Sequence, residues 1–260
     1  MKNSQLKIHL LQFASVDGQP MKTLRKLEAM LEKLAPAPGD WLLLPEMWPS
    51  GFSLAELERQ TVENAFCFYW MKKYAQARRC FLVGSMLEVK RGKRYNSAYV
   101  LDDRGRLQAY YRKIHLFRLA QEHLKFSAGE RLSVSAWPFG KLGLAICYDL
   151  RFPELFRRYA QQNVSLVTIP SAWPVDRLQH FRTLLQARAI ENQCFVVGIN
   201  KVGHDAQGRA YGGHSSVWGP WGEKLGELGQ KTGVLSVSLD FKKVAEIRKN
   251  YPFLKSRVFD

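Results

Sequence analysis

The pattern of apolar and polar positions predicts short buried strands that alternate with amphipathic helices. In the first helical segment, Leu24, Leu27, Leu31 and Leu34 recur at helical spacing, which places them on one face. The expected strands are residues 8–13, 41–44, 80–87, 95–101, 107–112, 142–146, 165–170, 194–200, 216–218, 224–228 and 234–238. The expected helices are residues 21–34, 66–74, 153–161, 178–192 and 241–249.

This order of elements fits a layered fold in which helices cover the outer faces of β-sheets. Two stacked sheets and one doubly wound sheet both satisfy the pattern, which alone does not choose between them. No linker, repeat or low-complexity segment divides the 260 residues, so we expect one domain over residues 1–260. A hydrophobic content of 46% is enough to build a substantial core.

Cys147 ends the apolar run 142–146, and Pro153 then fits the first turn of a helix. A side chain at such a corner can face a cleft. There the free N–H groups of a helix start favour the thiolate form of a thiol that titrates near about 8.5 in isolation. The alternative is that Cys147 is a small core hydrophobe, as free cysteines usually are. This segment alone leaves both interpretations open.

Charged residues end two other apolar runs. Glu46 follows residues 42–44, and Lys113 follows residues 107–112. Each alone is typical of a solvated strand end, but together with Cys147 they offer a base, a cation and a nucleophile. Because the active-site residues of layered α/β folds collect at strand ends, we expect these three side chains to meet.

The cysteine content and the lack of long apolar runs indicate where the protein is located and which kinds of site it lacks. The four cysteines (Cys67, Cys80, Cys147 and Cys194) lack Cys-x-x-Cys spacing, which argues against zinc and against a disulfide framework. We find no signal-peptide pattern and no apolar run near the roughly 18 residues that a membrane helix needs. We therefore expect a cytoplasmic protein.

The net charge of +16 suggests nucleic-acid binding as an alternative, non-enzymatic function. The basic residues are spread along the whole chain, however, and no nucleic-acid-binding motif accompanies them. A generally positive surface can equally attract a small anionic substrate. We therefore expect a small-molecule anion as the partner, rather than a nucleic acid or a membrane.

The three strand-end residues, in this order, resemble the Glu–Lys–Cys triad of the nitrilase, or carbon–nitrogen hydrolase, superfamily. Residues 188–193 are similar to the helix after the third motif of that family, and residues 212–222 are similar to its late hairpin. The resemblance runs from about Lys7 to about Tyr251. It implies the family fold, which is an α+β four-layer α-β-β-α sandwich of the nitrilase type.

Within the superfamily, the chain most resembles the omega-amidases, which hydrolyse the terminal amide of short 2-oxo dicarboxylic acid monoamides. This similarity lies in residues 45–52, 115–118, 121–123 and 147–153. It implies hydrolysis of 2-oxoglutaramate or 2-oxosuccinamate to the 2-oxo acid and ammonia through a cysteine thioester. The alternatives are superfamily amidases that act on N-carbamoyl compounds, aliphatic amides or deaminated glutathione.

The resemblance implies a role for each member of the triad. Glu46 takes the thiol proton, returns a proton to the departing amine and later activates water. Cys147 attacks the amide carbon, and the Lys113 ammonium and the backbone N–H of Tyr148 stabilise the oxyanion that forms. This scheme uses no metal and no organic cofactor.

A second carboxylate and two histidines lie near the triad in the sequence. Glu122 matches a further glutamate that the family places beside its triad. It either takes part in catalysis or pairs with Lys113 and orients the lysine, and we favour the second role. His115 and His123 are acid–base candidates by residue type, but with Glu46 in place we expect structural roles for both.

The expected substrate pocket combines aromatic residues with cations. The aromatic candidates, each of which also fits a core position, are Trp48, Phe52, Phe117 and Trp173. The candidates for binding a substrate carboxylate are Arg118, His123, Lys125 and Arg151. Arg151 could instead form an internal ion pair with Asp149 or Glu154.

The resemblance also implies a homodimer or a larger homo-oligomer. Family dimers pair across helices that include the one following the nucleophile, here residues 153–161. Leu155, Phe156 and Tyr159 on that helix serve either such an interface or the core of the chain.

Overall fold

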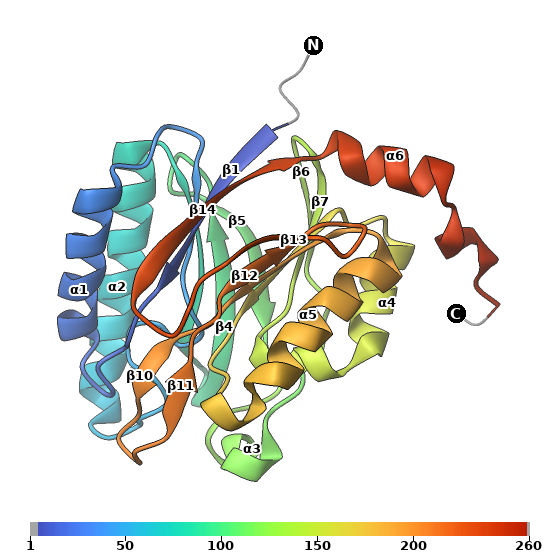
Figure 1. Ribbon diagram of the computed structural model, residues 1–260. Coiled ribbons are helices and arrows are strands. Elements are labelled where there is room, and N and C mark those ends of the chain that lie inside the picture. Colours follow the sequence, from blue (N-terminus) through green and yellow to red (C-terminus); the bar gives the residue numbers. More distant parts are fainter. Residues whose placement is uncertain (1–4, 259–260) are drawn as a thin grey trace.

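The computed structural model describes residues 5–258, which form two stacked β-sheets with helices on both outer faces (Figure 1). The first sheet has the order β14-β1-β2-β3-β4-β5, and the second has the order β13-β12-β9-β8-β7-β6. In the first sheet the strands are β1 (Gln5–Gln12), β2 (Trp41–Leu43), β3 (Phe81–Lys90), β4 (Lys93–Leu101), β5 (Leu107–Arg112) and β14 (Gly233–Asp240). In the second sheet they are β6 (Val134–Trp137), β7 (Gly140–Leu144), β8 (Leu166–Pro170), β9 (Phe195–Ile199), β12 (Ser216–Trp218) and β13 (Lys224–Glu227).

The helices cover the sheets in pairs. In Figure 1, α1 (Pro20–Leu34) and α2 (Leu57–Arg78) lie on one side, and α4 (Pro153–Gln161) and α5 (Leu178–Asn192) lie on the other. The remaining elements are the hairpin β10 (Val202–His204) and β11 (Ala210–Gly212), the helices α3 (Glu122–Lys125) and α6 (Lys242–Asn250), and the 3-10 turns η1 (Arg118–Ala120), η2 (Cys147–Arg151), η3 (Val175–Arg177) and η4 (Phe253–Ser256). This α-β-β-α order confirms the expected fold class. Among residues 5–258, no helix has the length and apolar character that a membrane span requires.

Alternation along the strands builds the layers, because successive side chains of a strand point to opposite faces. Leu43 of β2 packs between the two sheets, whereas its neighbour Leu42 packs under α1 and α2. In β9, Val197 faces the first sheet, and Val196 faces the α4 and α5 side. Each central strand is therefore apolar on both faces, as its sequence indicated.

The strand directions bring the chemistry to one edge. β2 is parallel to β1 and β3, and β7, β8 and β9 are parallel to one another. β5 runs in the same direction as β3, because two antiparallel pairings separate them. The two sheets meet at this edge, where the Glu46 N–H donates to the Ser171 carbonyl over 3.3 Å.

The observed elements differ from the expected ones mainly at α2 and at short strands. α2 spans 22 residues instead of the expected 66–74, because its pattern is not amphipathic. Gln60 and Asn64 are buried in it, whereas Val62 and Phe66 are exposed. The pattern also missed β6, β10 and β11, whose three or four residues are too few to show a period.

Candidate active site

The three residues expected to form the triad lie just beyond β2, β5 and β7, and the fold brings them together at one edge. Three residues in the left-handed backbone region shape the turns there: Met47 (φ 47°), Gln121 (φ 55°) and Cys147 itself (φ 46°). This conformation is uncommon for residues other than glycine and tends to occur where a fold must aim a side chain.

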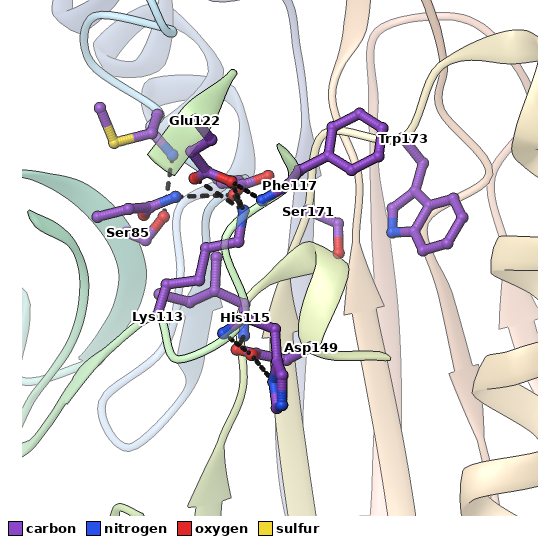
Figure 2. Close-up of polar contacts among 12 residues, drawn as sticks. Ser85, Lys113, His115, Phe117, Glu122, Asp149, Ser171 and Trp173 are labelled. Atoms are coloured by element: carbon purple, nitrogen blue, oxygen red, sulfur yellow. Dashed lines mark hydrogen bonds and ion pairs between the residues drawn. The ribbon is translucent and has the colours of Figure 1, made fainter. Parts of the chain in front are cut away.

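Lys113 lies between two carboxylates (Figure 2). Its Nζ donates to Glu46 Oε1 over 2.8 Å and to both carboxylate oxygens of Glu122 over 2.9 Å. Only 1% of Lys113 is exposed. Burial alone lowers the pKa of Lys113, but the nearby negative charges, led by Glu122 and Glu46, hold that pKa well above 10.5. The lysine is therefore a permanent cation.

Glu46 has one engaged and one free oxygen. Oε1 accepts from Lys113 and, over 2.7 Å, from Nδ2 of Asn96. Oε2 is buried without a hydrogen-bond partner among residues 5–258. Desolvation by burial raises the pKa of Glu46 above 4.5, against the lowering influence of Lys113. A carboxylate oxygen with no donor and a raised pKa can accept a proton from a neighbouring thiol.

Cys147 is partly exposed and faces the same cavity as Glu46 and Lys113. We expected its position at a helix start to favour the thiolate. The structure corrects this expectation, because burial and the charge of Glu46 raise the pKa of the Cys147 thiol well above 9.0. The thiol therefore rests protonated and needs a base at the moment of attack.

Asp149 fixes the corner that presents Cys147. Its buried carboxylate accepts from the Ile146 N–H over 2.9 Å, from Tyr111 Oη over 2.8 Å and from the His115 N–H over 3.0 Å. The His115 ring also meets this carboxylate, with Nδ1 2.7 Å from Asp149 Oδ1 (Figure 2). The same ring stacks on Phe152. This places His115 in a scaffold, in line with the structural role we expected. Among residues 5–258, Asp149 forms no ion pair with Arg151.

A cavity of about 230 Å³ lies beside Cys147. It is lined by Glu46, Lys113, Glu122 and Tyr148, the residue whose N–H we expect to face the oxyanion. Tyr148 is the second residue of η2, and the first N–H groups of such a turn have no acceptor within it. Of the other expected pocket residues, the lining includes Phe52, Phe117, Lys125, Arg151 and Trp173.

Three expected pocket residues lie outside the cavity. Trp48 is fully buried and packs on the side of the sheet that α1 and α2 cover. Arg118 and His123 are exposed on η1 and α3. α3 buries Glu122 on its inner side, and because helix neighbours point about 100° apart, His123 turns to solvent.

Several lining residues had not been singled out in the sequence. Arg177 is the last residue of η3 and directly precedes α5. The others follow β10, in a hairpin that the apolar pattern did not predict. They are Asp205, Gln207, Arg209 and Tyr211.

The thiols should differ sharply in reactivity. Cys67, Cys80 and Cys194 are buried, and desolvation raises the pKa of each to about 12. Iodoacetamide at neutral pH should modify Cys147 first, because it alone of the four is partly exposed and it lines the same cavity as Glu46, which can take its proton. C147S should leave the folded protein almost unmodified. Peptide mapping by mass spectrometry measures this. Comparable labelling of a buried cysteine in the folded protein would contradict the assignment.

Comparisons with known proteins fit this geometry. The carbon–nitrogen hydrolase family model matches residues 7–249. The chain is 37% identical to the 2-oxoglutaramate amidase of Bacillus subtilis (strain 168), covering 94% of this chain and 95% of that protein. It is 34% identical to the omega-amidase YafV of Escherichia coli (strain K12), covering 95% of this chain and 94% of that protein.

Solved structures show the same fold. XC1258 from Xanthomonas campestris, a CN-hydrolase superfamily protein with an arsenic adduct in its active site, is 30% identical with a TM-score of 0.91, covering 98% of each chain. The amidase from Nesterenkonia sp. AN1 is 28% identical with a TM-score of 0.84, covering 96% of this chain and 98% of that one. Its active-site cysteine carries the acetamide moiety of fluoroacetamide. On this evidence, the chain belongs to the carbon–nitrogen hydrolase family and, within this nitrilase superfamily, to the omega-amidase branch.

Proposed function

We propose that this chain is an omega-amidase that hydrolyses the terminal amide of short 2-oxo dicarboxylic acid monoamides to the 2-oxo acid and ammonia. The observation that carries the proposal is the cavity itself. It joins a Cys147–Glu46–Lys113 cluster to a wall that bears cations such as Arg151 and Arg177. The relatives named as 2-oxoglutaramate amidase and omega-amidase support the same substrate class.

In the first half of the reaction, Glu46 Oε2 takes the proton from Cys147 Sγ as the sulfur attacks the amide carbon. The carbonyl π electrons move to the oxygen, and a tetrahedral oxyanion forms. The oxyanion then collapses, the C–N bond breaks, and the protonated Glu46 gives its proton to the departing nitrogen, which leaves as ammonia. The acyl group stays on Cys147 as a thioester.

In the second half, Glu46 takes a proton from water, and the resulting hydroxide attacks the thioester carbon. The second tetrahedral intermediate collapses with loss of the Cys147 thiolate, which recovers a proton from Glu46. The carboxylic acid product and the free thiol remain. No step needs a group beyond these side chains and water.

Lys113 and Tyr148 stabilise the oxyanion of both intermediates in this proposal. Lys113 keeps its proton because its pKa lies well above 10.5, so it acts as a fixed positive charge and not as a proton donor. Glu122 uses both oxygens on Lys113, and its Oε2 also accepts from the Phe117 N–H over 2.7 Å. These contacts favour a positioning role for Glu122 over a direct role in proton transfer.

The contacts of Arg151 support it as the cation that binds the substrate carboxylate. Its guanidinium lies over the Trp173 ring at 4.7 Å and meets His180 Nδ1 at 3.3 Å. No carboxylate among residues 5–258 forms an ion pair with it, so the internal pairing with Asp149 or Glu154 is not formed. A guanidinium that is free of carboxylates can bind a substrate carboxylate in bidentate geometry.

The assembly is part of the proposal. Leu155, Phe156 and Tyr159 of α4 are at most 4% exposed and pack in the core, so they are not available to an interface. We propose instead that a homodimer or larger homo-oligomer uses the exposed aromatic cluster of Trp221 and Phe253, whose rings stack at 6.3 Å. A single domain over residues 1–260 and a cytoplasmic location also stay predictions.

The rate should depend on the ionisation of Glu46. Protonated Glu46 cannot take the thiol proton, so kcat/KM should fall as the pH drops through its raised pKa. The midpoint of this fall should lie above 4.5, the ordinary pKa of a glutamate. Deprotonation of Lys113 should cause no loss of activity up to about pH 10. Steady-state rates across pH test this. The exposed control E32Q should keep the profile, whereas a limb centred at or below 4.5 would contradict the role of Glu46.

The substrate preference should follow charge. 2-Oxoglutaramate or 2-oxosuccinamate should exceed butyramide in kcat/KM by at least about tenfold, or about 1.4 kcal/mol, because a neutral amide leaves Arg151 unpaired. R151Q should narrow the gap, whereas R118Q, the same change at an exposed site outside the cavity, should not. An ammonia-release screen that includes N-carbamoyl amino acids measures this. Equal rates on neutral amides, or a preference for N-carbamoyl compounds, would point to another amidase branch.

Light scattering at micromolar concentration should show a dimer or a larger species. Replacing Trp221 and Phe253 together by Ser should shift the mass towards the monomer, because the change removes exposed apolar area without touching the core. A matched pair of exposed changes on α2, V62S with Y69S, should leave the mass unchanged. A strict monomer for the unmodified chain would refute the assembly.

A further inference from the structure

Two N–H donors in the cavity wall have no hydrogen-bond partner. Trp173 Nε1 and Arg177 Nε are both buried, and no group in residues 5–258 accepts a hydrogen bond from either. Both residues line the cavity that contains Cys147. Trp48 Nε1 and Trp137 Nε1 are also without a partner among residues 5–258, but those residues do not line the cavity. The place of Trp173 and Arg177 in the cavity wall, together with their unpaired N–H groups, points to a ligand that supplies acceptors.

Trp173 is held rigidly. Its backbone N–H donates to Asn200 Oδ1 over 2.7 Å, and its carbonyl accepts from Asn200 Nδ2 over 3.1 Å and from the Gly212 N–H over 3.2 Å. Its ring packs against Phe181 at 5.7 Å, and only 3% of the residue is exposed. Figure 2 shows Trp173 on the same side of the site as Phe117 and Ser171. The indole N–H is therefore fixed before any ligand arrives.

Arg177 is held by an aromatic ring of the same cavity. Its guanidinium lies over Phe117 at 5.0 Å, and its side chain is 25% exposed. Asp176 Oδ2 approaches Arg177 Nε at 3.3 Å without forming a hydrogen bond, and the Asp176 side chain is 70% exposed. Solvent weakens such an exposed pair, so Arg177 keeps its charge available to the cavity.

We propose that Trp173 and Arg177 form the subsite that binds the 2-oxo carboxylate end of the substrate and discriminates against 2-amino acid amides. This inference rests on the proposed omega-amidase function. The indole N–H donates to an oxygen of that end, and the Arg177 guanidinium binds its negative charge alongside Arg151. A 2-oxo group offers only acceptor lone pairs, which match these donors.

An amino acid amide such as glutamine fits the same wall poorly. Its ammonium offers donors where the wall also offers donors, and it carries the same charge as Arg151 and Arg177. Asp205 is the one carboxylate outside the catalytic cluster that lines the cavity among the described residues. It already accepts from Tyr211 Oη and from the Gln207 and Arg209 N–H groups, so both of its oxygens are engaged, which weakens their attraction for an ammonium.

Two variants separate the contributions. W173F removes the N–H and keeps an aromatic ring, and R177Q removes the charge and keeps polar groups. The substrates are 2-oxoglutaramate, glutaramate (which has CH₂ in place of the 2-oxo group) and glutamine, each measured as kcat and KM. Exposed residues supply matched controls outside the cavity: W221F for the tryptophan and R118Q for the arginine.

W173F should lower the preference for 2-oxoglutaramate over glutaramate by about tenfold, because a site built to pair with a substrate group discriminates against analogues that lack it. R177Q should lower the preference for 2-oxoglutaramate over glutamine by at least about tenfold, mainly through KM. Both controls should keep both preferences within about threefold.

A binding measurement covers the case in which turnover becomes too slow. In the C147A background, calorimetry with 2-oxoglutarate and glutamate as probes should show the same loss of preference for the 2-oxo acid in R177Q. Equal losses on all three substrates, or unchanged preferences, would overturn the subsite. An unmodified enzyme that hydrolyses no 2-oxo acid monoamide would instead overturn the proposed function.

Discussion

The buried ion cluster of Lys113, Glu46 and Glu122 is the constraint on which the rest of the site depends. An ammonium that is 1% exposed is tolerated only with carboxylates in contact, and breaking such a buried pair costs about 3–5 kcal/mol. The carboxylates come from separate segments, one after β2 and one in α3, so the cluster ties both to the end of β5. Asn96 Nδ2 donates to Glu46 Oε1 and the Phe117 N–H donates to Glu122 Oε2, which leaves Glu46 Oε2 without a partner among residues 5–258.

The same cluster sets the protonation states that the chemistry needs. Two carboxylates hold the proton on Lys113, so the lysine is a fixed charge through the whole reaction. Burial raises the pKa of both Glu46 and the Cys147 thiol, which makes proton exchange between these neighbours easier than ionisation of either into water. These directions favour a resting state with an intact thiol beside a desolvated carboxylate, and in the proposed mechanism the thiolate forms as Cys147 attacks the substrate.

The sequence predicted most of the strands and the meeting of Glu46, Lys113 and Cys147 at one edge, because both depend on local signals. β5, α4, α5 and β12 have the expected bounds, and the charged residues directly after apolar runs marked the catalytic edge. Side-chain direction could not be predicted in the same way. Arg118 was expected in the substrate pocket and Arg177 was not singled out, yet only Arg177 lines the cavity, where its guanidinium lies over Phe117. The orientation depends on tertiary contacts that no local pattern encodes.

The charge of Lys113 is the central claim, and the rate constant of acylation, read from the burst of ammonia release, tests it most directly. K113M should lower this rate constant by about a hundredfold or more. Because K113M leaves two unpaired buried carboxylates, the double variant K113M/E122Q, with one fewer negative charge, provides a more stable form for the same measurement. We expect the loss in both variants, with little change in binding of the 2-oxo acid product. A folded K113M/E122Q enzyme that acylates within tenfold of the parent would contradict it.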